Sequence, residues 1–190
     1  MLCQKSKVLV IIQKLTLMKT SADSLKKSAD ALNDSSLWEK KKIKKKDEKT
    51  GEEIEVEDYD WDKITKAVKS FVEDYNDVVK EAGESSTKDV LRNATWMTGM
   101  TDKNSNMLAK IGITIGKGNK LELDEDALKQ ADISSLKTVF TGYNSFVSKI
   151  SQKATGISNA ANRASATYTN NGTYSKTDSS LTSSKIDKEV

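Results

Sequence analysis

The chain has 190 residues, of which 36% are hydrophobic, 31% charged and 6% aromatic, and it contains no proline. Its 31 basic and 28 acidic side chains give a net charge of only +3, so the overall charge demands neither a nucleic acid nor an anionic membrane. Histidine is absent and Cys3 is the single cysteine, which excludes Ser–His and Cys–His catalysis, an internal disulfide and a thiolate zinc site.

The N-terminal segment has the basic start and the apolar run, VLVII at 8–12, that signal peptides share. Gln13 and Lys14 interrupt this run, no A-x-A site follows, and the run is too short to span a bilayer. The same residues begin a heptad stripe formed by Val8, Ile11, Leu15, Met18, Ala22, Leu25, Ala29 and Leu32. We therefore predict one long helix in residues 1–36, which needs partner helices to be stable.

Residues 37–58 change character, because a lysine run at Lys40–Lys46 is followed within ten residues by a cluster of acids. We predict a β-hairpin or a solvated arm, in which a basic strand through Ile43 faces an acidic strand through Ile54 and Val56. A nucleic-acid or lipid patch is the alternative function of such a lysine run.

Residues 59–162 are predicted to form a helical bundle. One helix starts at Asp60 as N-cap and ends at Gly83, and its stripe consists of Trp61, Ile64, Val68, Phe71, Tyr75 and Val78. A further helix starts after Ser85 or Ser86, with Leu91, Ala94 and Met97 or Thr98 expected to point inward. The last helix runs from about Ser134 with the stripe Leu136, Val139, Tyr143, Phe146, Ile150, Ala154, Ile157 and Ala161.

The first and last helices carry matching stripes and are expected to pack on each other. Beyond Arg163 the chain is rich in serine, threonine and asparagine, so residues 163–190 are predicted to be a disordered tail.

Residues 111–132, IGITIGKGNKLELDEDALKQAD, interrupt the helices with a predicted hairpin at 111–123. Apolar side chains alternate at Ile111, Ile113, Ile115, Leu121 and Leu123, and Gly116 and Gly118 are expected to supply the positive φ of the loop. The loop lacks the dinucleotide fingerprint and the P-loop ending, and the acids at 124–126 lack the spacing of a calcium loop. Asp124 is instead predicted to cap the next helix, and we expect no catalytic residue, cofactor or metal.

Two blocks of the chain match a known family in order and near-family spacing over about 60–140. The first, ITKAVKSFVEDYNDVVKEA at 64–82, contains Phe71-Val72 and Tyr75-Asn76. The second, at 108–140, contains Leu108, Ile111, Gly112, Ile113, Gly118, Leu121, Leu123, Asp124, Leu128, Ala131, Val139 and Phe140. Together they resemble the C-terminal region of the flagellar hook-associated protein 2 family, the filament-cap proteins.

The resemblance implies export through the flagellar type III apparatus without a cleaved signal peptide. It also implies oligomerisation through terminal helices and a structural role at the extracellular end of a bacterial flagellum. Cap proteins are much longer and carry large β-rich domains, in whose place this chain offers only the charged hairpin.

We therefore predict a mainly α fold, an elongated helical bundle or coiled-coil-like stem with one or two short β-hairpins, and a structural, non-enzymatic function. The expected partners are further copies of the chain or other flagellar-type axial subunits, without a small-molecule substrate, a nucleic acid or a membrane span. Eight residues are predicted as bundle or subunit contacts: Leu15, Leu25, Leu32, Phe71, Tyr75, Val139, Phe146 and Ile150.

Three other functions remain open at the level of sequence. The same stripes suit a cytoplasmic coiled-coil adaptor or chaperone. The polar tail is compatible with a secreted effector or surface protein. The lysine run Lys40–Lys46 suits an anion-binding module, whose affinity would fall steeply with salt.

Overall fold

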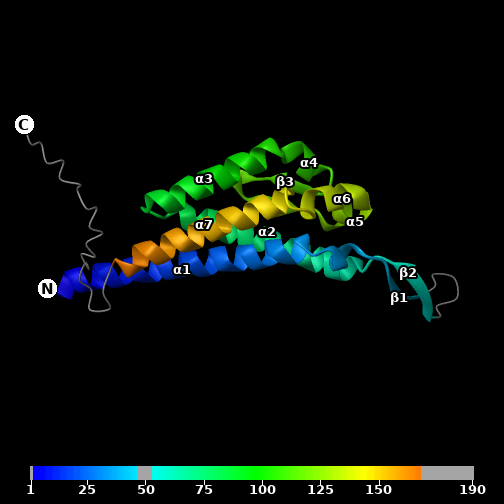
Figure 1. The fold of residues 1–190 in the computed structure, drawn as a ribbon, viewed down its shortest axis with the longest axis horizontal. Helices are drawn as coiled ribbons and strands as arrows, with labels where there is room; N and C mark the ends of the chain where they lie inside the picture. The colour runs from blue at the N-terminus through cyan, green and yellow to red at the C-terminus, as the bar shows by residue number, and fades with distance from the viewer. Residues whose placement is uncertain (1, 47–52, 168–190) are drawn as a thin grey trace, which may run out of the picture.

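A computed structural model describes residues 2–46 and 53–167, and these form an elongated helical bundle with a hairpin projecting from one end (Figure 1). The helices are α1 (Leu2–Asn33), α2 (Trp61–Gly83), α3 (Lys88–Lys103), α4 (Ser105–Ala109), α5 (Glu125–Gln130), α6 (Ile133–Phe140) and α7 (Phe146–Ala166). Two antiparallel hairpins pair β1 (Lys41–Lys46) with β2 (Glu53–Asp58), and β3 (Ile113–Ile115) with β4 (Leu121–Leu123). The predicted fold class is confirmed.

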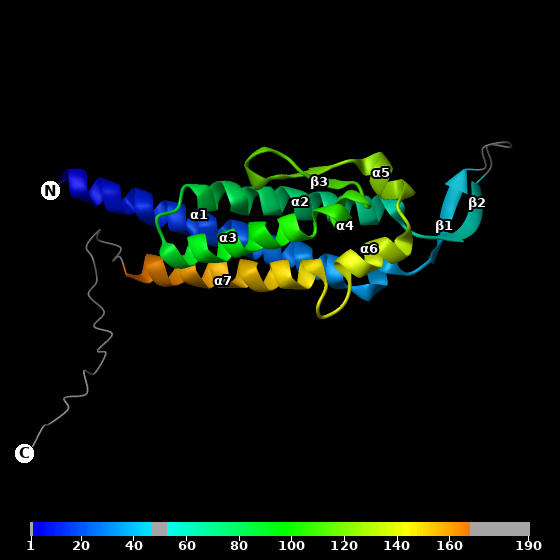
Figure 2. The ribbon, with the colours of Figure 1, turned by 90° about the horizontal axis from the view of Figure 1, so that it is seen from above.

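Helices α1 and α7 lie side by side along the bundle, and α2 and α3 pack on them (Figures 1 and 2). The α1–α7 contact is antiparallel, because the Ser158 hydroxyl meets Asp23 while the Ser151 hydroxyl meets Asp30, each at 2.6 Å. Fully buried alanines line both helices where they meet, at Ala22, Ala29, Ala154 and Ala161. These small side chains let the two backbones approach closely. The packing predicted from the matching stripes is confirmed.

Aromatic rings close the end of the bundle that faces the β1–β2 hairpin. After α1, a 3₁₀ turn (Ser35–Trp38) folds the buried Trp38 ring onto Phe140, with the centroids 5.5 Å apart and the planes nearly parallel. The Trp38 indole N–H donates to the carbonyl of Leu32 at 2.8 Å, which satisfies its one polar atom. Phe71 meets Phe140 and Phe146 edge-on at 6.5 and 6.3 Å, so one aromatic cluster joins α2, α6 and α7.

Asn76 on α2 forms two hydrogen bonds to the β3–β4 hairpin, whose Ile113 and Leu121 are buried in the core. Asn76 donates its amide N–H to the carbonyl of Leu121 at 2.8 Å and accepts the Leu121 backbone N–H at 2.7 Å. An unpaired backbone edge is thereby satisfied by a side chain, as a buried strand requires. This contact explains the asparagine of the Phe-Val-x-x-Tyr-Asn block.

Two details of this hairpin differ from the predicted ones. Gly118 does have a positive φ of 69°, but Gly116 has φ −91°, and the other left-handed residues are Gly112 and Asn119. Gly112 requires glycine for two reasons. Its φ is positive, and a Cβ there would lie 2.6 Å from the carbonyl oxygen of Asp124. Ile111 is buried but lies before the strand, which begins only at Ile113.

The last helix was predicted to be continuous from about Ser134. This prediction was wrong, because the helix is interrupted between α6 and α7, at residues 141–145. Gly142 adopts φ +99° and donates its N–H to the Asn33 side chain at 2.8 Å, which ties the break to the end of α1. Ser145 then caps α7 by accepting the backbone N–H of Ser148. Tyr143, placed in the predicted stripe, is instead 83% exposed.

Boundaries and facing residues shift by small amounts elsewhere. In α3 the predicted inward residues Ala94 and Met97 are buried, but Leu91 is exposed and the neighbouring Val90 is buried instead. The N-cap position is Thr87 rather than Ser85 or Ser86. Helix α7 continues to Ala166, three residues beyond the predicted start of the tail, and most of that predicted tail lies outside the described residues. No helix in residues 2–46 and 53–167 combines the length and apolarity needed to cross a membrane.

Substitution of Gly142 should destabilise the fold through backbone strain alone, because an added Cβ would meet no other atom within 4 Å. Gly142→Ala is expected to lower the free energy of unfolding by about 1 kcal/mol or more, because alanine is strained at positive φ. Gly99→Ala is the matched control, since an added Cβ also meets nothing within 4 Å there, but the glycine sits inside helix α3. The free energy of unfolding of the Gly99→Ala variant, measured by urea denaturation, should rise by about 0.5–1 kcal/mol. Equal effects of the two changes would contradict the proposed strain.

The cap of α5 gives a second measurable contribution. Asp124 accepts the backbone N–H groups of Asp126 and Ala127 at 3.0 and 2.9 Å. Asp124→Ala should therefore cost about 1 kcal/mol of stability, while Asp124→Asn should retain most of it. A chelator should leave the melting temperature unchanged, and chelator-induced melting would contradict a purely capping role.

Candidate assembly surface

The described residues offer no metal centre on which a chemical function could be built. Within 2–46 and 53–167, no three or more cysteine, aspartate or glutamate side chains group in a way that could hold a metal ion. The candidate functional features are surfaces. Some predicted contact residues are covered by the chain itself, and some apolar side chains are left exposed to solvent.

All eight predicted contact residues lie in the core of the single chain. The structure brings several of them together, since the Phe71 ring lies 6.3 Å from those of both Tyr75 and Phe146. Leu25 and Leu32 on α1 and Ile150 on α7 are fully buried in the same core. Their burial is explained without a second chain, so a role for them in subunit contacts stays a prediction.

Tyr75 is a buried residue whose polar hydroxyl is hydrogen-bonded within the core. Its hydroxyl donates to Thr101 at 2.9 Å, and Thr101 in turn donates to the carbonyl of Met97 at 3.0 Å. Burial raises the pKa of Tyr75 to about 12, against a smaller lowering by the Thr101 hydrogen bond. The phenol is therefore neutral at physiological pH and serves to join α2 to α3.

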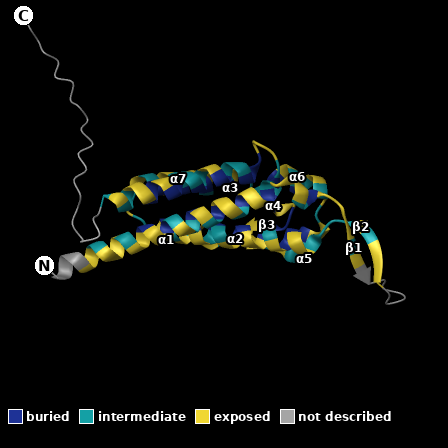
Figure 3. Cartoon of the chain, turned by 60° about the horizontal axis from the view of Figure 1, so that its bottom comes forward, coloured by how far each residue is buried: buried dark blue, intermediate teal, exposed yellow. Residues whose placement is uncertain are grey.

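The N-terminal part of α1 extends past the end of the bundle (Figures 1 and 3). The antiparallel register that sets Asp23 beside Ser158 places Ala166, the last residue of α7, opposite Leu15. Burial begins at that point, because Leu15 is the first buried residue of the heptad stripe among the described side chains. The helix therefore leaves its partner at Leu15.

Before that point α1 carries five consecutive apolar residues, at 8–12, of which Leu9 is 55% exposed. Leu17 lies just after that point, outside the core stripe, and is 50% exposed. Leu9, Val10, Ile11 and Leu17 form what we call the exposed apolar segment. At 100° per residue, Val8 and Ile11 continue the core stripe, whereas Leu9, Val10 and Leu17 lie on the other sides of the helix. A helix that is apolar all round is normally enclosed by neighbours.

A cavity connects this segment to the core. It has a volume of about 210 Å³ and lies between α1, the turn after α2 and the end of α7. Ile11, Leu15 and Met18 line one side of it, and polar residues of the turn after α2 line the other. One ion pair joins two of its lining residues, from Lys14 Nζ to a Glu84 carboxylate oxygen at 3.1 Å.

Charges at the α1–α7 contact repeat at a spacing of seven residues. Asp23 and Asp30 each accept a serine hydroxyl from α7, and each also pairs with the lysine one turn earlier on α1, Lys19 or Lys26. Burial acts to raise the pKa of both carboxyls, but the hydrogen bonds from lysine and serine outweigh it and hold each pKa below its ordinary value. The ionised form of both groups is thus favoured by folding.

The exposed apolar segment was not among the predicted contact residues, although one signal for it was present. The signal is a set of apolar residues outside the heptad stripe, Leu9, Val10 and Leu17. A helix that packs on one side only normally carries polar residues at such positions. The Asp23–Asp30 spacing also matches the Ser151–Ser158 spacing, which could have indicated the antiparallel register.

Together these features define an elongated, mainly helical structural stem with an uncovered apolar terminus. In comparison with known protein families, the profile of the flagellar hook-associated protein 2 C-terminus matches residues 85–189. Since this is more than half of the chain, the protein belongs to that family, whose members are structural proteins of the flagellar cap. No curated protein and no solved structure matches the chain.

The matched residues run from the start of α3 through α7 and beyond the described part. They contain the block at 108–140 whose resemblance was noted in the sequence, and that recognition is confirmed. The block at 64–82 lies before the matched residues.

The paired aspartates should make the α1–α7 contact acid-sensitive. Because each folded-state pKa is lowered, the stabilisation is present above the unfolded pKa of about 3.9 and is lost as pH falls through the lower folded value. Replacing both Asp23 and Asp30 by Asn should cost about 1–2 kcal/mol at neutral pH and flatten the loss of stability below about pH 4. Thermal unfolding across pH measures this.

Asp102→Asn, at an exposed position on α3, is the control and should leave the acid limb of the profile unchanged. An Asp23 and Asp30 double variant with the same acid limb as the unchanged protein would contradict the assigned role of the two carboxylates.

Proposed function

We propose that this protein is a structural, non-enzymatic subunit of the extracellular cap or axial part of a bacterial flagellum. It would assemble through the exposed apolar segment of α1. The observation that carries the proposal is that α1 continues beyond the point where α7 ends and exposes Leu9, Val10 and Ile11 there. Membership of the flagellar hook-associated protein 2 C-terminus family supports the flagellar setting.

The physical basis is the free energy of covering the exposed apolar segment. Burying a leucine or valine side chain contributes about 1.5–3 kcal/mol relative to leaving it in water, and the segment offers several of them on adjacent turns. A helix that projects from a bundle has little stability of its own, so its order depends on neighbours.

The expected partners are further copies of the chain or other flagellar-type axial subunits. Leu9 lies on a different side of the helix from Val10 and Leu17, so one flat neighbour cannot cover all three. This arrangement supports enclosure by two or more helices, as in a bundle formed by several chains.

Two of the sequence-level alternatives are less well supported. An anion-binding role for the lysine run is weakened because β1 pairs lysines with acids of β2, Lys42 with Glu57 and Lys44 with Glu55. A cytoplasmic adaptor or chaperone could use the same apolar segment, but the family match favours the flagellar role.

Assembly should depend on the exposed apolar segment and not on the fold. The full chain with Leu9, Val10 and Leu17 all changed to Gln should show self-association weakened by at least about tenfold in sedimentation velocity under reducing conditions. Its melting temperature as a monomer should stay close to that of the unchanged protein, because these side chains are exposed.

Leu91→Gln is the matched control, since Leu91 is an exposed leucine on α3, outside the exposed apolar segment, and it should associate normally. A chain that remains strictly monomeric at high concentration, with α1 helical to its end, would refute the proposal.

A further inference from the structure

The β1–β2 hairpin separates charge by strand. The described side chains of β1 are basic apart from Ile43, and those of β2 are acidic apart from Ile54 and Val56. The hairpin projects from the end of the molecule opposite the N-terminus of α1 (Figures 1 and 2). It is thus a second exposed element, remote from the exposed apolar segment.

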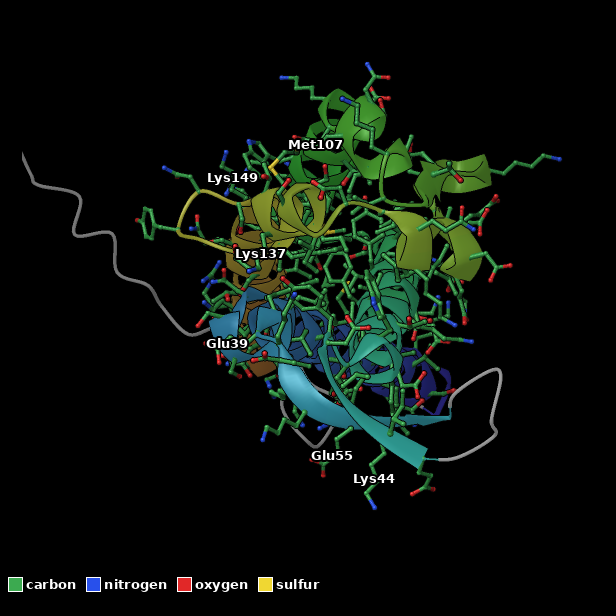
Figure 4. All side chains as sticks on the ribbon, turned by 90° about the vertical axis from the view of Figure 1, so that its right-hand side faces the viewer. Glu39, Lys44, Glu55, Met107, Lys137 and Lys149 are labelled. Carbon is green, nitrogen blue, oxygen red and sulfur yellow. The ribbon has the colours of Figure 1, made fainter. Side chains whose placement is uncertain are left out.

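The register gives the two faces of this hairpin different chemistry. On one face the cross-strand pairs of described side chains are each a lysine and a glutamate, namely Lys42 with Glu57 and Lys44 with Glu55. Figure 4 shows Lys44 and Glu55 on the side that points away from the helices. Lys44 also forms an ion pair with Glu53 at 3.6 Å along the same face.

The opposite face is partly apolar. Ile43 lies opposite Val56, both half-buried, and Ile54 follows on the same face with 41% of its surface exposed. Side chains that alternate in this way fit a sheet with one solvated face. The apolar row is short, however, since two strands supply only three such side chains.

Both outer edges of the sheet are available to another strand. Among the described residues the sheet consists of β1 and β2 only, so neither outer edge is covered by a third strand. An edge strand presents backbone N–H and C=O groups that pair readily with a further strand. Here one edge is basic and the other is acidic.

The charges decide which pairings are possible. Two β1 edges would place lysine opposite lysine, and two β2 edges would place glutamate opposite glutamate, both of which are unfavourable. A β1 edge beside the β2 edge of another copy would repeat the lysine–glutamate pairs already present inside the hairpin. It would also extend the apolar row, by bringing Ile43 beside the Val56 and Ile54 of the neighbour.

We propose that the hairpin is a docking element for a second copy of this chain, in which the basic edge of β1 pairs with the acidic edge of the neighbour's β2. Antiparallel pairing continues through the contact, so the sheet grows from copy to copy. Because the two contacting edges differ, every copy keeps one edge of each kind, and the contact forms a closed ring or an open row.

Lysines on an edge strand commonly prevent association. That protection works against basic or neutral edges, whereas this chain supplies its own acidic edge. Exposed ion pairs are individually weak and are screened by salt, so the contact should be weak alone and weaken further as salt is added. It becomes effective when other contacts already hold the copies together.

Cross-linking of the unchanged full chain tests the contact directly. An equal mixture of ¹⁴N- and ¹⁵N-labelled protein is treated at low salt with a carbodiimide, which joins lysine to carboxylate without a spacer. Peptides that link Lys44 to Glu55 within one isotope are the internal control, since these residues pair inside the hairpin. We expect mixed-isotope Lys44–Glu55 peptides as well, fewer at high salt; their absence overturns the proposal.

Charge reversal tests the specificity. K42E/K44E reverses two β1 lysines and E55K/E57K reverses their two β2 glutamate partners, so in either variant alone like charges meet at these positions of the contact. Each variant alone should give about tenfold fewer mixed-isotope hairpin cross-links. The two variants mixed together, and the chain carrying all four changes, should recover them because opposite edges are restored. Sites for the linkage are supplied in each case by Lys41 and Asp58, which occupy paired positions in the register and are unchanged in every variant.

Two outcomes of this series count against the contact. If the mixed-isotope cross-links return neither in the mixture nor in the fourfold variant, the proposal is overturned. Undiminished cross-linking in both single-strand variants also overturns it. The Leu9, Val10 and Leu17 variant changes the far end of the molecule and is read by sedimentation, whereas the charge-reversal variants are read by hairpin cross-links, so failure of one assembly contact is distinguished from failure of the other.

Discussion

Helices α1 and α7, from opposite ends of the described chain, pack along a row of alanines and larger apolar side chains, and the other elements are built on this pair. Bringing such distant segments together has an entropic cost that only close packing offsets. Alanines at Ala22, Ala29, Ala154 and Ala161 permit that closeness, and the Asp–Ser pairs fix the register. With the pair in place, α2 packs on α1 and α3 packs on α7.

The same pair determines where the bundle ends and hence what the molecule exposes. Because α7 stops opposite Leu15, the residues of α1 before it lose their neighbour and leave an apolar terminus. At the other end Trp38 and Phe140 close the core, and the chain leaves it as a charged hairpin. One end therefore offers a non-directional apolar surface, whereas the other offers directional strand edges with complementary charge.

Much of the fold follows from local patterns in the sequence. The helix starts at Asp60 and Asp124 were predictable, because an aspartate before an apolar periodic segment satisfies the free N–H groups of the first turn. The break between α6 and α7 was not, since Val139 and Phe146 keep helical spacing across it and only Gly142 marks the turn. In α3 the predicted inward residues Ala94 and Met97 are buried, but at the start of the helix the core takes Val90 in place of Leu91.

The sequence alone determined which residues of each helix are apolar on one side, because helical periodicity of burial is a local property. It also determined the charge separation of the hairpin, since the lysines and the acids are contiguous in the chain. Only the tertiary structure decided what covers each stripe. The eight predicted contact residues are covered by the chain itself, whereas Leu9, Val10 and Leu17 are not. For Leu9 and Val10 the reason is that the length and register of α7, far away in the sequence, set the last residue of α1 that has a partner. Leu17 lies within the paired part of α1, but on a side that its neighbours leave exposed.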